Sequence, residues 1–487
     1  MLRAFSAERV RAAEESLMAT LPAGELMSRA ASGLAEVCRV RLSARGGTVV
    51  VGLVGPGNNG GDALFALAQL ADGGFSCAAV RGGWPVHEEA LAAAGAAGVL
   101  VVDGTHRGSA AAALAKADLV VDGILGIGGR PGLPAVAVPW VDAVPDDAYV
   151  LAVDLPSGQD PAGESASDAG VFADETVTFG VPKPVHLLAV TEPAVGRLTV
   201  VDIGLEVDGT PDVERLGWDD VAGLWPVPGT ADDKYSRGVL GVVAGGEDYT
   251  GAAVLCCTAA VECGVGMVRY VGTPAPTALV RQAVPEAVHG DGRVQAWVVG
   301  PGLDTSSRAR GSKAQLDVAR AALASDLPVL VDAGGLDLVS SPRPGATLLT
   351  PHAGELATLL TRLEGEEVTR QQVAASPLAH ARRAADRLDA TVLLKGSTTL
   401  VVPPSASGLP VRSQADAPPW LATAGAGDVL ASLAGTLLAA GLSPLDAGSL
   451  AALVHGVAAD RANPGGPVRA HAVARGIPTT VAALLTR

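Results

Sequence analysis

The sequence predicts an α/β protein built from two domains in tandem. Short apolar stretches rich in β-branched residues alternate with longer alanine- and leucine-rich stretches along most of the 487 residues. The apolar stretches are continuous rather than alternating with polar residues, which indicates parallel strands buried on both faces of a sheet. A segment at 210–237 that has little regular periodicity and is punctuated by proline and glycine interrupts this order, and we predict that it is an irregular connection between domains. We therefore place the boundary near Asp208 and predict domains at 1–208 and 209–487.

The composition indicates large cores and excludes several partners. Hydrophobic residues make up 48% of the chain and charged residues 18%, with a formal net charge of -16. Nucleic-acid binding needs clustered Lys and Arg, so we expect no nucleic-acid partner. The longest apolar run, at 429–442, is too short to span a bilayer and predicts a buried helix, so we expect no membrane partner. Scarce charges and large apolar helices favour a homo-oligomer.

The cysteines and the first residues predict a cytoplasmic protein. No C-x-x-C pair or disulfide framework is present, so the thiols are expected to be reduced, mostly as core residues. The opening stretch MLRAFSAERVRAAEE has charges where a signal peptide needs apolar residues. The cysteines are Cys38, Cys77, Cys256, Cys257 and Cys263.

The first domain is predicted to be a Rossmann-like three-layer α/β/α sandwich. Apolar residues recur at helical spacing over 6–42, with a break at 21–24, which predicts two helices before the first strand. Helices are expected between the first few strands, and the last two strands close the same sheet. The predicted strands lie within 48–55, 77–83, 98–103, 117–126, 149–158, 175–180 and 197–204.

A glycine pattern follows the first strand of this domain. Gly55, Gly57 and Gly60 fit G-x-G-x-x-G, the loop that brings backbone N–H groups close to a pyrophosphate. A dehydrogenase of this kind also needs an acidic residue at the end of the second strand, where this chain has Arg81. The pattern is therefore a weak sign of a nicotinamide cofactor site. The amides and carboxylate of the sequence NNGGD that follows can instead bind a polar ring or a monovalent cation.

Other polar residues follow neighbouring strands of the first domain. Asp122 precedes a second glycine loop, Asp154 and Ser157 follow the next strand, and Lys183 follows a later one. Ligands bind at the carboxyl ends of parallel strands, so these groups are expected around one crevice. Each alone can equally be an ordinary turn residue.

The second domain repeats the alternation with different glycine loops. Alanine-rich helices separate many of its strands, and the last two strands are joined by a tight turn over Lys395, Thr398 and Thr399. The predicted strands lie within 238–246, 266–272, 296–302, 328–334, 346–352, 390–396 and 398–404.

A long apolar helix near the C-terminus is predicted to begin at the sequence AGAGD. Gly425, Ala426 and Gly427 precede Asp428, so backbone N–H groups can form an anion site beside a carboxylate that acts as a base in phosphoryl transfer. Asp428 can equally be a helix cap. His352 stands at a strand-to-helix junction, where it is a candidate ligand or a structural residue. The chain has no Walker A sequence, which argues against a P-loop kinase.

The first domain resembles the NAD(P)H-hydrate epimerase domain, the YjeF N-terminal family, through GPGNNGGDALFALAQLA, VVDGILGIGGR, AVDLPSG and ELMSRAA. The resemblance implies hydrated NAD(P)H (NAD(P)HX) as substrate, a catalytic Asp154 beside the reacting ring, and K+ held by Asn59, Asp122 and Ser157. The implied substrate-binding residues are Asn58, Asn59, Gly60, Gly61, Asp62, Gly126, Ile127, Gly128, Gly129, Arg130, Pro131 and Gly132.

The second domain resembles the ribokinase-like ADP-dependent NAD(P)H-hydrate dehydratase family, the YjeF C-terminal family. The similarity lies in KYSRGVLGVVAGGEDYTGAAVL, VVGPGLD, TPHAGELATLL, VLLKGSTTLV and AGAGDVLA. It implies ADP as co-substrate, with Mg2+, and Asp428 as the base that deprotonates the ring hydroxyl for attack on the terminal phosphate. Substrate contacts are implied for Ala253, Gly302 and His352. The implied nucleotide-binding residues are Lys395, Gly396, Ser397, Thr398, Thr399 and Gly427.

The two resemblances together predict a bifunctional repair enzyme. The first domain would interconvert the R and S forms of NAD(P)HX, and the second would dehydrate the S form with ADP, giving AMP and phosphate. Two other hypotheses stay open from the sequence. One is a ribokinase-type small-molecule kinase with an accessory nucleotide-binding domain, and the other is a non-catalytic regulator.

Overall fold

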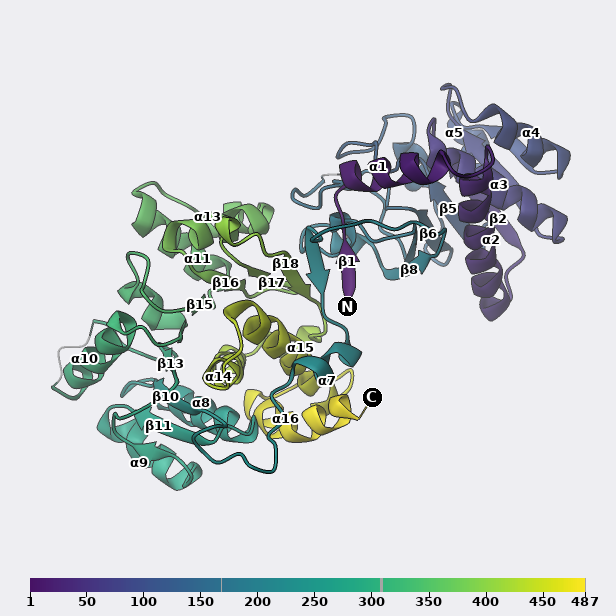
Figure 1. The fold of residues 1–487 in the computed structure, drawn as a ribbon. Helices are drawn as coiled ribbons and strands as arrows, with labels where there is room; N and C mark the ends of the chain where they lie inside the picture. Colours follow the sequence, from purple (N-terminus) through teal and green to yellow (C-terminus); the bar gives the residue numbers. More distant parts are fainter. Residues whose placement is uncertain (168, 307–309, 487) are drawn as a thin grey trace. The chain divides into compact units, whose positions relative to one another are not determined.

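The computed structural model describes residues 1–167, 169–306 and 310–486, which divide into two compact units. One unit comprises Arg3–Val213, and the other comprises Glu214–Arg487 together with Met1 and Leu2. Figure 1 colours the chain from purple at the N-terminus to yellow at the C-terminus. The boundary between the two units lies between Val213 and Glu214, a few residues after the boundary that the sequence predicts near Asp208.

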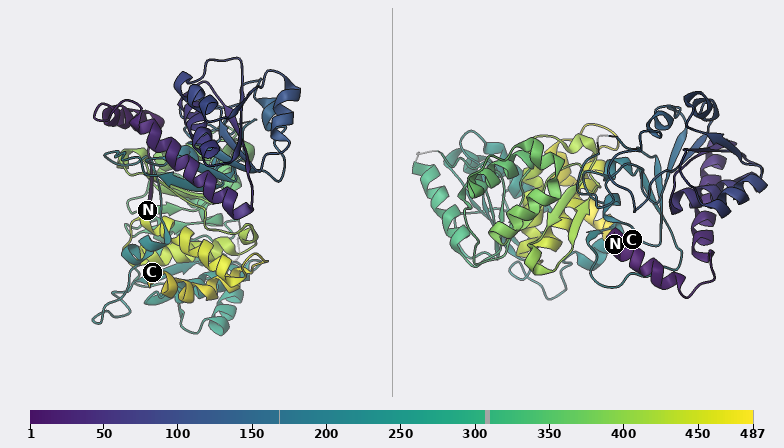
Figure 2. Two further views of the ribbon diagram at one scale, coloured as in Figure 1. Left: turned by 90° about the vertical axis from the view of Figure 1, so that its right-hand side faces the viewer. Right: turned by 90° about the horizontal axis from the view of Figure 1, so that it is seen from above.

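The N-terminal unit contains a seven-stranded sheet in the order β4-β3-β2-β5-β6-β7-β8, with every neighbouring pair parallel. Two helices, drawn in purple in Figures 1 and 2, precede its first strand as predicted. The strands are β2 (Val49–Val54), β3 (Ser76–Arg81), β4 (Leu100–Asp103), β5 (Leu119–Gly123), β6 (Tyr149–Val153), β7 (Glu175–Phe179) and β8 (Arg197–Val201). The helices are α1 (Ala7–Met18), α2 (Glu25–Arg45), α3 (Asn58–Asp72), α4 (Glu88–Ala96), α5 (Arg107–Leu114) and α6 (Val138–Val141).

Alternate residues of the central strands face two separate cores. Val50 and Val54 of β2 join a cluster with apolar residues of α2, α3 and α4. Val51 and Leu53 of the same strand join a second cluster with residues of α5 and Trp140 of α6. Successive side chains of a strand point to opposite faces, so helices cover both faces of the sheet. The predicted three-layer α/β/α sandwich is confirmed.

The second sheet has eleven strands among the described residues, in the order β1-β9-β18-β17-β16-β15-β14-β13-β10-β11-β12; β1 and β9 each contain a unit boundary, and the other strands belong to the C-terminal unit. The pairs from β12 to β16 are parallel, and β17 is antiparallel to β16 and β18. Its strands are β1 (Leu2–Ala4), β9 (Val213–Arg215), β10 (Val239–Val243), β11 (Met267–Val271), β12 (Val288–His289), β13 (Ala296–Val299), β14 (Val329–Val331), β15 (Thr347–Leu349), β16 (Thr391–Leu394), β17 (Thr399–Val402) and β18 (Val411–Gln414).

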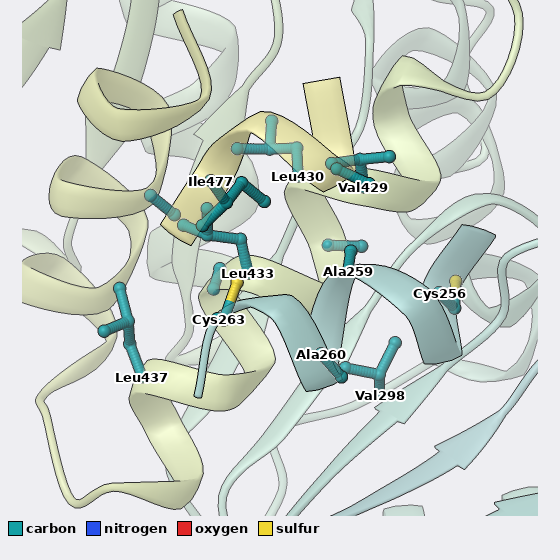
Figure 3. Close-up of a cluster of buried hydrophobic side chains, with 14 of the residues drawn as sticks. Cys256, Ala259, Ala260, Cys263, Val298, Val429, Leu430, Leu433, Leu437 and Ile477 are labelled. Carbon is teal, nitrogen blue, oxygen red and sulfur yellow. The ribbon is translucent and has the colours of Figure 1, made fainter. Parts of the chain in front are cut away.

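The helices of this unit bury the largest core. Helix α14, which contains the long apolar run, is buried at every position from Val429 to Ala439, as predicted. Its side chains pack against α8 and α16 around Cys256, Leu433 and Ile477 (Figure 3). The helices are α7 (Val221–Leu224), α8 (Thr250–Glu262), α9 (Pro274–Ala283), α10 (Arg310–Ala324), α11 (Ala353–Glu364), α12 (Arg370–Ala375), α13 (Pro377–Leu388), α14 (Ala426–Ala439), α15 (Pro444–Ala462) and α16 (Ala470–Leu485).

The segment predicted as an irregular connection, 210–237, is partly regular. It contains β9 and α7, and its Leu216 and Val221 are buried in the core of the C-terminal unit. The five cysteines are free and buried, as expected for core residues. Among the described residues, no helix combines the length and the apolar character that a membrane span requires.

Candidate functional site

The N-terminal unit has a cavity at the carboxyl end of its sheet. The chain continues from β2 to β3 and β4 on one side and then crosses to β5 on the other side of β2. This reversal opens a crevice where ligands bind in parallel sheets. A cavity of 580 Å³ lies there, lined by α1, α2, the start of α3, the segment 124–129 after β5, and Asp154 after β6.

The sequence NNGGD forms the first turn of helix α3 rather than an extended glycine loop. Helix α3 begins at Asn58, and only Gly55, Pro56 and Gly57 separate it from β2. A Cβ atom at Gly60 would lie 2.2 Å from the carbonyl oxygen of Gly55, so a larger residue would push the helix from the strand end. Gly60 therefore sets how closely α3 approaches the strand end.

Asn59, Asp122 and Ser157 are brought together beside the cavity. The Asn59 side-chain nitrogen donates to the carbonyl oxygens of Val153 (2.6 Å) and Leu125 (3.2 Å). The Ser157 hydroxyl donates to Asp122 (2.6 Å), and the Ser157 N–H donates to its other oxygen (2.8 Å). Burial raises the pKa of Asp122 to about 6, although both hydrogen bonds from Ser157 lower it. These side chains and carbonyls offer only oxygen ligands to a cation, which suits a hard ion such as K+.

Asp154 belongs to a buried hydrogen-bonded network. Its φ of +66° is unusual for a residue other than glycine and occurs most often at functional positions. Lys183 Nζ lies 2.6 Å from Asp154 Oδ1, and the Thr178 hydroxyl donates to the same oxygen at 3.0 Å. Burial raises the pKa of Asp154, but the Lys183 ammonium outweighs burial, so this pKa lies below its ordinary value. The carboxylate therefore stays ionised.

His186 supports Asp154 through the backbone. The Lys183 N–H donates to His186 Nδ1 (2.9 Å), so a neutral imidazole carries its proton on Nε2, which lies 2.7 Å from the Asp154 carbonyl oxygen. Burial lowers the pKa of His186 to about 4, which keeps the ring neutral at physiological pH.

Asp62 and Glu14 add two further carboxyl groups to the cavity. Asp62 is 6% exposed, and its Oδ1 atom is buried without a hydrogen-bond partner among the described residues. Burial, followed by repulsion from Asp154 and Glu14, raises the pKa of Asp62 well above its ordinary value. Burial also raises the pKa of Glu14, on helix α1. Of these three carboxyl groups, Asp154 is therefore ionised, whereas Asp62 and Glu14 hold their protons more strongly.

The remaining predicted residues of this unit occupy three different settings. Gly126 to Gly129 line the cavity with Asn58, Asn59 and Asp62. Arg130 and Pro131 are exposed, and the Gly132 N–H donates to the Gly158 carbonyl oxygen (2.8 Å). Gly61 is buried in the first turn of α3, where a Cβ atom would lie 3.3 Å from His87.

The C-terminal unit carries its candidate site at the corresponding end of its sheet. The strand order reverses between β10 and β13, and α14 begins nearby with Gly425 at its N-cap. Gly425 has φ +87°, and a Cβ atom there would lie 2.5 Å from Leu255 and 3.9 Å from Asp428 Oδ2. This backbone turn brings Asp428 into the first turn of the helix, next to helix α8, where Cys256 Sγ lies 3.5 Å from the Asp428 carbonyl oxygen.

Lys395 and Asp332 adjoin the start of α14. Lys395 Nζ lies 2.8 Å from Asp332 Oδ1 and 3.5 Å from Glu355 Oε2. A Cβ atom at Gly427 would lie 3.4 Å from Lys395 Nζ and 3.9 Å from Asp332 Oδ2. Burial, followed by repulsion from Asp332, raises the pKa of Asp428 to about 7, although Lys395 lowers it. Asp428 can therefore exchange a proton near neutral pH, as a general base requires.

His352 lies beside Lys395, to which it is joined by a parallel β-bridge. It caps helix α11: its Nδ1 accepts the N–H of Glu355, and Glu355 accepts the His352 N–H in return. His352 also lines a 330 Å³ cavity. His352 therefore has the structural role of a helix cap. Its side chain is also exposed, so a ligand can contact it.

The other predicted residues of the C-terminal unit lie after the neighbouring strands β10 and β13 and in the turn between β16 and β17. Ala253 is buried in the first turns of α8, close to Gly245 after β10, and Gly302 follows β13 beside Ala252. In the predicted tight turn between β16 and β17, Gly396 and Ser397 are exposed, Thr398 is buried and Thr399 begins β17.

Four site residues were missed by the sequence reasoning. Asp332 stands at the end of β14 in the sequence VDAGG, and the rule about strand ends could have identified it. Thr178, His186 and Glu14 offered no such signal, because only the fold brings them near Asp154 or into the cavity. Among the described residues, no group of three or more His, Cys, Asp or Glu side chains is arranged to hold a metal ion.

Comparison with known families divides the chain in the same way. Residues 23–185 match the family model described as YjeF-related protein N-terminus, and residues 240–477 match the model described as NAD(P)H-hydrate dehydratase.

Two curated relatives are similar along nearly the whole chain. The bifunctional NAD(P)H-hydrate repair enzyme Nnr of Mycobacterium leprae is 43% identical over 99% of this chain and 99% of its own. The enzyme with the same description from Mycobacterium tuberculosis is 44% identical over 90% of this chain and 89% of its own. Among solved structures, the ADP/ATP-dependent NAD(P)H-hydrate dehydratase from Bacillus subtilis is 24% identical, with a TM-score of 0.49, over 56% of this chain and 99% of its own.

Proposed function

The chain belongs to the family of bifunctional NAD(P)H-hydrate repair enzymes, and from this premise we propose how its two units carry out the repair. The family unites an epimerase, which interconverts the R and S forms of NAD(P)HX, with a dehydratase that restores NAD(P)H from the S form. We assign epimerisation to the N-terminal cavity and dehydration to the site at the start of α14. The single observation that supports the second assignment most strongly is Asp428, a half-buried carboxylate in the first turn of α14 whose pKa is raised to about 7 by desolvation and by Asp332.

In the proposed dehydration, Asp428 removes the proton from the ring hydroxyl of the S form. ADP supplies the terminal phosphoryl group that this hydroxyl accepts, and loss of phosphate then restores the nicotinamide ring, leaving AMP. Lys395 and the N–H groups at Gly427 are placed to balance the phosphate charge. Ala253, Gly302 and His352 would hold the substrate, and Gly396 to Thr399 would complete the nucleotide site.

Mg2+ fits this site as a companion of the ADP phosphates. Mg2+ is usually bound by substrate phosphates and one or two carboxylates. Glu355, beside Lys395, is the carboxylate that offers an oxygen ligand. The ion would neutralise phosphate charge next to the carboxylates of Asp332 and Asp428.

In the proposed epimerisation, Asn58, Asp62 and the segment Gly126–Gly129 contact NAD(P)HX while Asp154 faces the reacting ring. The other residues of the predicted set support these contacts indirectly. Gly60 and Gly61 allow close packing at the start of α3, and Arg130, Pro131 and Gly132 continue the loop that begins with Gly126–Gly129. K+, held by oxygens of Asn59, Asp122 and Ser157, would fix the loop against the end of β6.

The proposed function is tested by adding ADP to purified full-length protein and a mixture of R- and S-NADHX. Complete recovery of reduced-nicotinamide absorbance is the expected result. Recovery of the S fraction alone would remove the epimerase assignment. No recovery with ADP or ATP would remove the dehydratase assignment, and a stable phosphorylated product would indicate a kinase instead.

Four finer properties are part of the proposal and have direct tests. Parallel assays with ADP and ATP measure the nucleotide preference, and replacing K+ by Na+ measures the cation dependence of epimerisation. Light scattering after size-exclusion chromatography tests the expected homo-oligomer. Cell fractionation tests the expected cytoplasmic localisation.

A further inference from the structure

The N-terminal cavity contains a carboxyl group whose surroundings differ sharply from those of Asp154. Asp62 is nine-tenths buried at the start of α3, and its Oδ1 atom has no hydrogen-bond partner among the described residues. Buried polar groups are almost always hydrogen-bonded, and an exception points to a missing partner such as a ligand. Because Asp62 lines the same cavity as Asp154, that ligand is the proposed substrate.

The two carboxyl groups are prepared for opposite roles. Asp154 is hydrogen-bonded to Lys183 (2.6 Å) and Thr178 (3.0 Å), both of which stabilise its charged form. Among the described residues, Asp62 has no cation or hydroxyl partner of this kind, and its burial favours the neutral acid. A pair of carboxyl groups held in opposite protonation states is the arrangement that divides acid and base work between two side chains.

We propose that Asp62 is the proton donor of the epimerase, a role that rests on the proposed function of the N-terminal unit. The hydrated ring carries its hydroxyl on a carbon next to the ring nitrogen. Asp62 gives its proton to this hydroxyl, and the C–O bond breaks with its electron pair leaving on the oxygen, as water. The nitrogen lone pair forms the C=N bond of a cationic ring.

The same pair completes the inversion. A water molecule adds to the opposite face of the cationic ring, and Asp154 accepts the proton that this water loses. One water leaves and one enters, so the product differs from the substrate only in configuration. Asp154 stabilises the cation between the two steps, and solvent returns the proton from Asp154 to Asp62 after product release.

Several other charged groups lie near Asp62, and each has to be considered as the proton donor. The titratable and charged side chains that line this part of the cavity or face the start of α3 are Arg11, Glu14, Glu15, His87, Asp154 and Lys183. Arg11 and Glu15 are exposed on α1, and His87 caps α4 through Nδ1. Glu14 is the competing acid, because it too is a carboxyl group of the cavity with a raised pKa.

The first test uses wild-type protein in water labelled with 18O, without ADP so that the dehydratase is idle. Pure S-NADHX is incubated with the protein, the R form is separated by chromatography, and its mass is measured by mass spectrometry. The R form produced by uncatalysed epimerisation in a sample without protein is subtracted. One 18O atom in each newly formed R molecule is the expected result. R product without label would overturn the proposal, because the C–O bond would then have stayed intact. No R product at all would instead remove the proposed epimerase function.

The second test compares Asp62→Asn with Asp72→Asn, an exposed position at the end of the same helix. Asp62→Asn should lower the epimerisation rate by about 10²- to 10⁴-fold, the usual contribution of a general acid. Dehydration of S-NADHX with ADP should persist in both variants, which shows that the C-terminal unit is intact, and unchanged hydrogen exchange of peptides from β2 and α3 shows that the N-terminal unit is folded. Epimerisation at nearly the wild-type rate in Asp62→Asn, or an equal loss in Asp72→Asn, would overturn the proposal.

The third test identifies the acid by its titration. The wild-type epimerisation rate should fall on the alkaline side as Asp62 loses its proton, and this limb should vanish in Asp62→Asn but remain in Glu14→Gln. A limb that vanishes in Glu14→Gln and remains in Asp62→Asn would assign the donor to Glu14 and overturn the proposal.

Discussion

Asp154 and Asp428 both stand at the carboxyl end of a largely parallel sheet, but their neighbours give them opposite properties. Asp154 lies 2.6 Å from the Lys183 ammonium, and this partner lowers its pKa despite complete burial. Asp428 has the carboxylate of Asp332 as its strongest charged neighbour, and burial with this repulsion raises its pKa to about 7. The comparison shows that the same end of a sheet can hold a carboxylate with either property, and that the nearest charged side chain decides whether its pKa is lowered or raised.

Replacing Asp428 by Asn should have the largest effect on catalysis. The variant keeps the size of the side chain but cannot accept the hydroxyl proton, so dehydration should slow by about 10²- to 10⁴-fold. Recovery of reduced-nicotinamide absorbance from S-NADHX with ADP measures this loss. Epimerisation without ADP should stay at the wild-type rate, and an equal fall in both reactions would contradict the division of labour between the units.

Replacing Lys183 by Met should remove the ammonium group that lowers the pKa of Asp154. The change leaves a buried carboxylate without its cation, which typically costs about 3–5 kcal/mol. Hydrogen exchange of peptides from β6 and β7 measures the free energy of opening of this unit at neutral pH. Lys116→Met, at an exposed position, is the matched control and should change it by less than about 0.5 kcal/mol.

The sign of the pH dependence follows from the lowered pKa of Asp154. In the wild type, this carboxylate adds stability above its ordinary pKa, and the contribution is lost as the pH falls through the lowered folded value. The difference between wild type and Lys183→Met should therefore be greatest at neutral pH and shrink on acidification. A difference independent of pH would show that Lys183 stabilises the unit by packing alone.

A pH profile of dehydration should distinguish Asp428 from Asp154 again. The base must be ionised, so kcat/KM with S-NADHX should fall about tenfold per pH unit below the Asp428 pKa of about 7. Asp332→Asn should move this limb to lower pH, because it removes the charge that repels Asp428 and keeps the attraction of Lys395. An unmoved limb in Asp332→Asn would assign the titration to another group. Asp154, whose pKa is lowered, should give epimerisation no acid limb near pH 7.

The sequence predicted where most strands lie along the chain, the strand end that carries Asp154 and the helix start that carries Asp428, because apolar runs and glycine turns are local signals. It did not predict β18, in which Ser413 and Gln414 are buried and hydrogen-bonded to the β9 segment. A strand stabilised by polar side chains lacks the apolar run on which prediction depends. The pairing of Lys395 with Asp332 was missed for a related reason, since it joins residues far apart in the chain.

Gly427→Ala should have the smallest effect and should act on the nucleotide rather than on the base. The new Cβ would lie 3.4 Å from Lys395 Nζ, the mobile end of a long side chain, so the helix can accept it. Alanine also favours a helix over glycine by up to about 1 kcal/mol, so the C-terminal unit should not lose stability. The methyl group would narrow the space beside the N–H groups proposed for phosphate. We therefore expect a several-fold rise in the KM for ADP with little change in kcat, measured against Gly223→Ala, which adds a methyl group in open space on α7. An unchanged KM for ADP would mean that the phosphates do not bind at the start of α14. The reaction assigned to Asp428 would then have to occur elsewhere.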